Sequence, residues 1–251
     1  MGNGDGTVHF RDGLAIAQVI LFAFPFFSAL HFRWTRRICW FTIGGFSIIR
    51  CVGAGCMLGT INRNVKSLWA GVFVCESLGV LLLIFTLLEM LEKINKSVPT
   101  VHKRVFWIPQ LLTWIDIGIS IGGFVTVSKK ESDQLLPTTF SRAGIAILFV
   151  IFLYTAGVWL KFWLKRHQYG QEEYWLAMCT GVCVPFLLIR ALYSVIFIIT
   201  ADMTWNAVKG NSAAYLVMTM LPEVAFVGIC CYTLWNTAPG SVSEQQGKNL
   251  R

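Results

Sequence analysis

The sequence predicts an all-α, polytopic membrane protein whose core is a bundle of seven transmembrane helices. Hydrophobic residues make up 55% of the 251 residues and charged residues only 14%, and the mean hydropathy is +0.62. A soluble domain has roughly 25% charged residues, and one of this size could not bury so much apolar surface. The composition therefore excludes a soluble enzyme, a secreted disulfide scaffold and a disordered regulator.

Seven apolar runs reach the roughly 20 residues that a helix needs to cross a bilayer. They cover residues 13–32, 39–61, 68–91, 105–127, 143–164, 174–199 and 213–235. The connections are short, so residues 13–235 are predicted to form one membrane domain. Residues 1–12 precede it, with one basic residue against two acids, which is not the charge pattern of a signal-peptide n-region. Residues 236–251 follow it as a tail.

The basic residues predict the orientation of these helices. Excess Lys and Arg mark the cytosolic side of a membrane protein. Residues 1–12 and the even-numbered connections contain seven basic residues, whereas the odd-numbered connections and the tail contain twelve. We therefore expect a lumenal or extracellular N-terminus and a cytosolic C-terminus. The sequon at Asn95 lies on the predicted cytosolic side, so we expect it to carry no glycan.

The net charge of +8 is thus interpreted as an orientation signal, and nucleic acid is not an expected partner because no recognition motif accompanies the basic residues.

The eight cysteines all lie in apolar runs, as expected for buried thiols that act as small hydrophobic residues. Cys179 and Cys183 share a helix face, but two thiols without a histidine make a poor zinc site.

Five ionisable residues lie well inside predicted spans, where each costs roughly 2.5–3.5 kcal/mol on insertion scales. They are Arg50, Glu76, Asp116, Arg190 and Glu223. Contact with lipid would be prohibitive for these groups, so we expect them to converge in one polar pocket inside the bundle. Such a pocket has two interpretations, structural and catalytic.

In the structural interpretation the arginines and carboxylates form buried ion pairs that fix the order of the helices. The catalytic interpretation starts from the surplus of carboxyl groups, three against two arginines. A desolvated carboxyl without a cation favours its protonated form, and a neutral acid in an apolar cavity can act as a general acid. Glu76 and Asp116 are the candidates, whereas Glu223, after Pro222, is expected to pair with an arginine. Trp114 could face lipid, or shield a carbocation with its ring.

Several functional classes lack their signatures. The last predicted span has no lysine, which excludes a retinal Schiff base of the rhodopsin type. There is no Asp-Asp-x-x-Asp motif for a magnesium-bound diphosphate, and no histidine in the core of a span. Nucleotide-binding and nucleophile-elbow motifs are missing as well. We therefore expect no metal and no cofactor.

Four segments resemble a fungal family of seven-helix membrane proteins known only as a domain of unknown function. They are Phe10–Gln18, Ser47–Arg50 followed by Gly53-Ala54, Pro185–Arg190 with Tyr193-Ser194, and Leu221-Pro222-Glu223. The resemblance extends from about residue 9 to 236. It implies that Arg50, Arg190 and Glu223 belong to a shared network. Where this chain has Glu76, the family has an uncharged polar residue, often Gln. By analogy with fungal membrane cyclases of meroterpenoid pathways, the resemblance also suggests cyclisation of epoxidised prenyl chains.

The leading hypothesis is a membrane-bound terpene cyclase of fungal secondary metabolism, located in the endoplasmic reticulum. Glu76 or Asp116 would protonate an epoxide on a lipophilic substrate from the bilayer, and a second carboxylate, such as Glu223, would accept the released proton. Other membrane enzymes of the pathway would be partners. The alternative is a non-enzymatic sensor, receptor or scaffold with a structural ion network.

Overall fold

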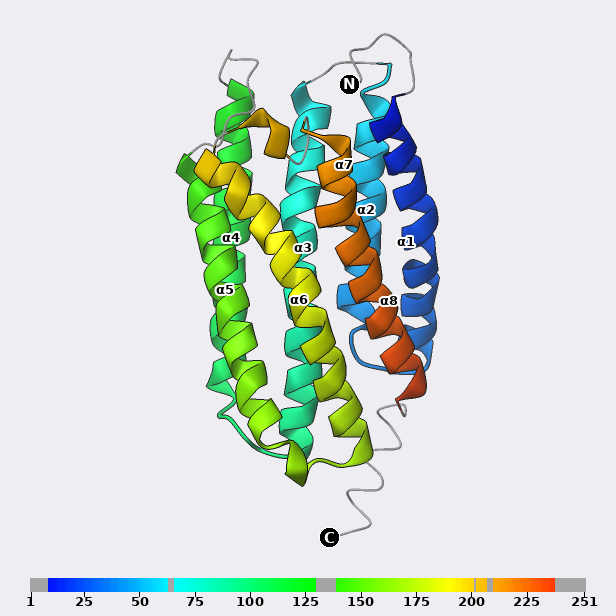
Figure 1. The fold of residues 1–251 in the computed structure, drawn as a ribbon, viewed down its shortest axis with the longest axis vertical. Helices are drawn as coiled ribbons and strands as arrows, with labels where there is room; N and C mark the ends of the chain where they lie inside the picture. The colour runs from blue at the N-terminus through cyan, green and yellow to red at the C-terminus, as the bar shows by residue number, and fades with distance from the viewer. Residues whose placement is uncertain (1–8, 63–65, 130–138, 201, 207–209, 238–251) are drawn as a thin grey trace.

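The computed structural model describes residues 9–62, 66–129, 139–200, 202–206 and 210–237, and helices are the only regular structure in these ranges. The helices run roughly side by side between two ends of a bundle (Figure 1). They are α1 (Phe10–Trp34), α2 (Trp40–Gly59), α3 (Lys66–Ser97), α4 (Arg104–Lys129), α5 (Thr139–Leu164), α6 (Gln171–Thr200), α7 (Ser212–Tyr215) and α8 (Leu221–Asn236).

Three short segments complete the described elements. The 3-10 turn η1 (Arg166–Gln168) precedes α6, and a second, η2 (Met203–Trp205), follows it. The π-helical turn η3 (Leu216–Met220) joins α7 to α8, so that α7, η3 and α8 form one continuous rod. The seven predicted spans thus correspond to seven helical rods. Of the predicted flanking segments, residues 1–8 and 238–251 lie outside the described residues.

Six of the rods are long and apolar enough to cross a membrane, which indicates an integral membrane protein. These stretches are Phe10–Trp34, Trp40–Gly59, Gly71–Ser97, Arg142–Leu164, Gln171–Thr200 and Ser212–Asn236. The rod missing from this set is α4, the helix that contains Asp116. It is nevertheless packed along α5 and against α3.

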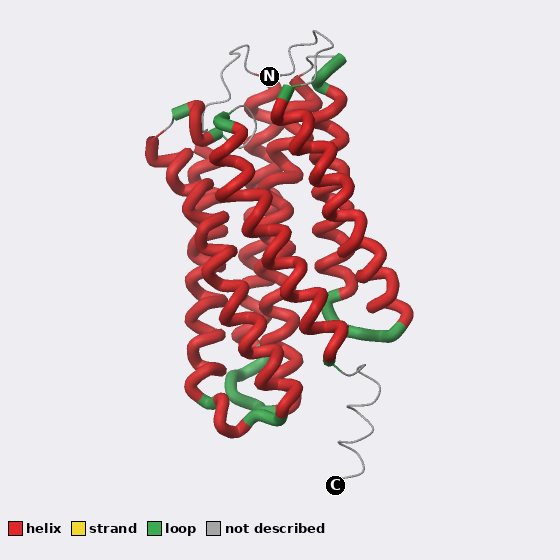
Figure 2. Tube along the Cα trace, turned by 45° about the vertical axis from the view of Figure 1, so that its right-hand side comes forward, coloured by secondary structure: helices red, strands yellow, loops and turns green. Residues whose placement is uncertain are grey.

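Helix α3 lies in the middle of the bundle (Figure 1), and Figure 2 shows the side-by-side helices from a second direction. It packs against α2, α4, α5 and α6. Its middle is buried on nearly every side, from Val80 to Leu91, as expected for a helix that is apolar all round. The outer helices instead expose large apolar side chains, such as Phe24 and Phe27 on α1. This surface suits contact with lipid tails.

Arg37, in the connection from α1 to α2, secures the end of α8. Its guanidinium donates hydrogen bonds to the backbone oxygens of Leu234, Trp235 and Thr237, the last two at 3.0 and 2.6 Å. These bonds satisfy carbonyls that a helix end leaves without partners, and a positive charge there also suits the helix dipole. The first and last transmembrane rods are therefore fastened together at this end.

Asn95, the sequon residue, caps the turn from α3 to α4. Its Nδ2 donates to the Val101 oxygen at 3.0 Å, and its Oδ1 accepts from the backbone N–H groups of Thr100 and Val101, both at 2.9 Å. The side chain is buried. The nitrogen that a glycan would modify is therefore already engaged in the fold, which is a second reason to expect no glycan.

We predict that Asn95→Ala lowers the free energy of unfolding by about 1–3 kcal/mol, because the substitution leaves buried backbone groups of the turn without partners. Thermal unfolding of the purified protein in detergent measures the effect. Lys96→Ala is the matched control, since the neighbouring Lys96 side chain is 72% exposed and forms an exposed ion pair with Glu92. Equal stability of the two variants would contradict the capping role.

Candidate functional site

Two arginines and two glutamates form a closed set of ion pairs inside the bundle. We call Arg50 (α2), Glu76 (α3), Arg190 (α6) and Glu223 (α8) the ion ring. Arg50 bonds Glu76 at 2.6 Å and also bonds Glu223; Arg190 bonds both glutamates at 2.9 Å. At most 6% of any of the four residues is exposed. Each carboxylate therefore faces two guanidinium groups, and each guanidinium faces two carboxylates.

Local backbone features make room for this ring. A Cβ atom at Gly79 would lie only 3.1–3.2 Å from the guanidinium atoms of Arg50, so a glycine one turn after Glu76 lets that flat group lie against α3. On the last rod, Pro222 lacks the N–H that would bond one turn back. The π turn η3 lies immediately before it. Such turns shift the register of side chains, here just before Glu223.

The four charges of the ring sum to zero, which lowers the free-energy cost of burying them in an apolar bundle. Two guanidinium cations compensate two carboxylates, and most of their polar atoms are hydrogen-bonded. Arg190 also donates to Ser194 at 2.9 Å. The exceptions are Arg50 Nε and Glu223 Oε2, which have no partner among the described residues. A buried pair of this kind is costly to break, because the remaining charge loses its compensation.

Tyr215 and Gln18 extend the ring toward the end of the bundle where α1 begins. The Tyr215 hydroxyl donates to Glu76 at 2.5 Å and accepts from Gln18 Nε2 at 2.7 Å. The guanidinium of Arg11 lies over the Tyr215 ring, 5.0 Å from its centre. A small cavity lined by Gln18, Arg50 and Glu76 lies on this side of the ring.

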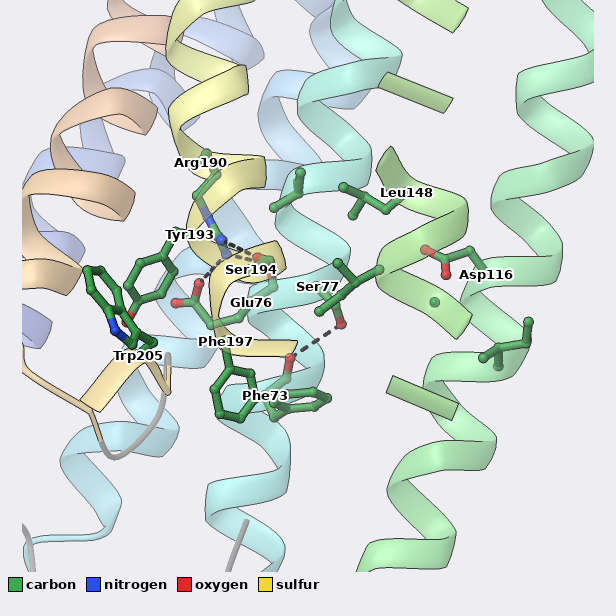
Figure 3. A pocket seen from close by; sticks show the side chains of 14 residues that line it. Phe73, Glu76, Ser77, Asp116, Leu148, Arg190, Tyr193, Ser194, Phe197 and Trp205 are labelled. Carbon is green, nitrogen blue, oxygen red and sulfur yellow. Dashed lines mark hydrogen bonds and ion pairs between the residues drawn. The ribbon is translucent and has the colours of Figure 1, made fainter. Parts of the chain in front are cut away.

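A larger cavity lies on the other side of the ring, between α3, α4, α5 and α6 (Figure 3). It holds about 700 Å³ of space, its open mouth included. Glu76 and Arg190 form its polar wall, and Phe73, Phe197 and Trp205 are among its aromatic residues. We call it the main cavity.

Asp116 of α4 lines the main cavity across from the ring (Figure 3). Only 1% of this residue is exposed, and its Oδ1 has no hydrogen-bond partner among the described residues. It forms no ion pair among them either. Burial without a compensating cation favours the neutral acid of such a carboxyl over its carboxylate. The main cavity therefore combines an apolar lining with one buried acid. Tyr193 also lines this cavity, and its buried hydroxyl likewise has no partner among the described residues.

The structure brings together four of the five embedded charges that the sequence singled out. Glu76, considered there as a carboxyl without a cation, contacts both arginines and Tyr215; Glu223 also contacts both arginines. The carboxyl without an arginine is Asp116. It shares the main cavity with Glu76 and Arg190 but does not join the ring.

Of the two positions considered for Trp114, the structure shows the one on the outer surface, so its placement as a residue of the pocket is not supported. Trp114 is 74% exposed and does not line the main cavity. The reason is helical geometry, because two residues correspond to a rotation of about 200°. When Asp116 points inward, Trp114 points to the outer surface. Three further site residues were not predicted, although each is a polar side chain in or beside a predicted span: Gln18, Tyr193 and Tyr215.

A family model described as a domain of unknown function (DUF7702) matches residues 8–237. Because the match covers most of the chain, the protein belongs to this family. No curated protein and no solved structure matches the chain. The family assignment itself carries no activity.

We predict that Arg190→Met lowers the free energy of unfolding by about 3–5 kcal/mol, because it leaves two buried carboxylates with one cation. The double variant Arg190→Met/Glu223→Met should recover part of this loss, since it also removes one of the orphaned charges. Unfolding in detergent is the measurement, and Arg104→Met, at an exposed arginine, is the control. A loss no larger than that of the control would contradict the ring's structural role.

Proposed function

We propose that the protein is a membrane-bound terpene cyclase of the fungal meroterpenoid type, which opens an epoxide on a prenylated, lipophilic substrate and closes a ring. One observation carries the proposal: the buried carboxyl of Asp116, which forms no ion pair among the described residues, in an aromatic-lined cavity. A neutral acid held in an apolar site is the group that epoxide opening requires.

The lining of the main cavity supports an apolar substrate that passes through cations. Phe73, Phe197 and Trp205 supply aromatic rings, and ring faces attract cations by roughly 0.5–2 kcal/mol each. Water would trap such cations, so a site inside an apolar bundle favours ring closure over hydration. The substrate would reach the cavity from the bilayer.

The reaction is an isomerisation. Asp116 gives its proton to the epoxide oxygen as the C–O bond breaks, which leaves a hydroxyl group and a carbocation. An alkene of the prenyl chain, or a hydroxyl group of the substrate, attacks the cation and forms the new ring bond. The surplus proton then leaves for a carboxylate. Glu76 lies on the cavity wall, where it can accept this proton. Return of the proton from Glu76 to Asp116 restores the starting protonation states of both groups. This balance uses no cofactor.

Within this scheme Glu223 and the two arginines position Glu76. Arg50 and Arg190 stabilise its carboxylate form, so that Glu76 and Asp116 differ in protonation state although both are buried. Two carboxyl groups held in different states by their surroundings are suited to base and acid roles respectively.

The proposed arrangement in the membrane has seven spans, with α4 as the span that carries the acid. The asymmetry of basic residues supports a lumenal or extracellular N-terminus and a cytosolic C-terminus, in the endoplasmic reticulum. The open mouth of the main cavity would then lie within the bundle's membrane-embedded part, and membrane enzymes of the same pathway could supply the epoxide.

A second candidate function is a non-enzymatic sensor, receptor or scaffold. The ion ring favours this function, because its two arginines and two glutamates pair with one another, as the charges of a purely structural network would. In that case Asp116 would have no chemical task, and the main cavity would hold a ligand or lipid without converting it.

We predict that Asp116→Asn lowers cyclisation at least about 100-fold, since a general acid contributes roughly 10²–10⁴-fold, while the protein remains folded. The assay supplies epoxidised prenyl precursors to microsomes and follows isomeric products by chromatography and mass spectrometry. Glu92→Gln is the matched control, because Glu92 is a half-exposed carboxylate outside the cavity. Full cyclisation by both Asp116→Asn and Glu76→Gln would refute this mechanism.

We further predict that Leu148→Trp, which enlarges a side chain of the cavity wall, abolishes turnover without touching a charged group. Binding of the precursor, measured by its retention on the purified protein, should fall in parallel. Unchanged turnover would place the reaction outside the main cavity. If the wild-type protein binds the precursors but leaves them unconverted, the sensor or receptor function is favoured.

A further inference from the structure

Three buried thiols meet at a second place in the bundle, between α6 and α8. Cys179 and Cys183 lie one turn apart on α6, and Cys230 faces them from α8. Their sulfur atoms all lie within 4.8 Å of one another, and the Cys183 and Cys230 sulfurs are 3.7 Å apart. Exposure is at most 4% for each residue. We call them the thiol triad.

The triad is separate from the ion ring and the main cavity. Cys183 precedes Arg190 by seven residues on α6, and Cys230 follows Glu223 by seven residues on α8, so both lie about 10 Å along the helix from the ring. The main cavity's lining includes no cysteine. Neither the proposed reaction nor the family assignment gives these thiols a task.

We propose that the thiol triad binds a soft, monovalent metal ion, with Cu(I) as the natural occupant. Thiolate sulfur is the donor that selects Cu(I), zinc and iron–sulfur clusters over harder ions. Metal–sulfur bonds of about 2.3 Å set three sulfurs around one ion roughly 4 Å apart. The sulfurs need to move by less than about 1 Å to reach that spacing.

The number of ligands separates Cu(I) from zinc. Structural zinc sites are almost always tetrahedral with four protein ligands, whereas the group found among the described residues has three members and no histidine or carboxylate. Three sulfurs suffice for a trigonal Cu(I) site. Thr233 lies beside Cys179, where its hydroxyl group can donate a hydrogen bond to a thiolate.

The surroundings of the triad suit a metal that must be kept from water and oxygen. Leu176, Leu187 and Phe226 belong to the same buried cluster of the core and are at most 1% exposed. A dry, apolar shell also strengthens the attraction between thiolates and a cation. The same shell makes thiolates without a cation costly, so ionisation of the triad and metal binding occur together.

The test uses the full-length protein, purified in detergent under reducing conditions and titrated with Cu(I) against a Cu(I) chelator. We expect one Cu(I) per chain, a sulfur-to-copper absorption in the ultraviolet, and a higher Tm for the loaded protein. Ag(I), which does not change oxidation state, should occupy the same site. Zn(II) should neither bind at this stoichiometry nor displace Cu(I).

Cys183→Ala should weaken Cu(I) binding by roughly 100-fold or more, because it removes a metal ligand. Mutation of a residue that only hydrogen-bonds to a metal ligand already lowers metal affinity about 10–100-fold. Cys231→Ala is the matched control, because Cys231 is adjacent to Cys230 and similarly buried but is not a member of the triad. Folding of each metal-free variant is checked by its Tm. If Cys183→Ala does not fold, protection of the wild-type thiols from alkylation by bound Ag(I) replaces that comparison.

Three results would overturn the proposal: no stoichiometric Cu(I) binding by the wild-type protein, equal weakening by Cys231→Ala, or a preference for zinc. The thiols would then be packing residues only. None of these measurements uses a terpene substrate, so the metal site and the proposed cyclase activity can fail independently.

Discussion

The cost of placing four charges inside an apolar bundle constrains the rest of this structure. No member of the ion ring is stable in that environment alone, so α2, α3, α6 and α8 must bring their charged residues to the same depth and the same side. A shift of one helix by a single turn would move its charge by about 5.4 Å and break two ion pairs. The ring thereby fixes the register of four helices at once, which the largely interchangeable apolar contacts of a membrane bundle cannot do.

The balance of the ring also determines what Asp116 can be. Both arginines of the ring form ion pairs with Glu76 and Glu223, and among the described residues neither of them pairs with a third carboxyl. Asp116 comes from α4, which contributes no member of the ring, and it meets the ring only across the main cavity. A carboxyl paired with two arginines and a carboxyl without an ion pair among the described residues thus face the same space. This pairing of opposite protonation states is the chemical basis of the proposed function.

The sequence predicts the helices and most of the embedded charges of the candidate site. The features that it did not predict have physical causes. Apolar runs locate the helices because bilayer thickness fixes their length, and the cost of embedded charge identifies Arg50, Glu76, Asp116, Arg190 and Glu223 as a group. Which of the three carboxyl groups lacks an arginine partner depends on side-chain distances between helices. No local pattern in the sequence gives these distances. The same limit hid the third thiol: Cys179 and Cys183 share a visible spacing, but Cys230 joins them only through the packing of α6 on α8. Trp114 is two residues from Asp116 in the sequence but lies on the outer surface of α4, and nearness in sequence could not decide between its two possible positions.

The ion pairs divide the bundle into two parts. Ion pairs and hydrogen bonds link α1, α2, α3, α6 and the last rod, through the ring, Tyr215 and Arg37. Helices α4 and α5 complete the main cavity without contributing a described residue to the ring, and α5 is joined to α6 by a hydrogen bond from Trp159 Nε1 to the Ala177 oxygen at 3.0 Å. A small displacement of α4 would therefore change the distance from Asp116 to Glu76 without breaking an ion pair of the ring. In the proposed reaction, the acid would lie on a helix outside the ring and the base on a helix that belongs to it.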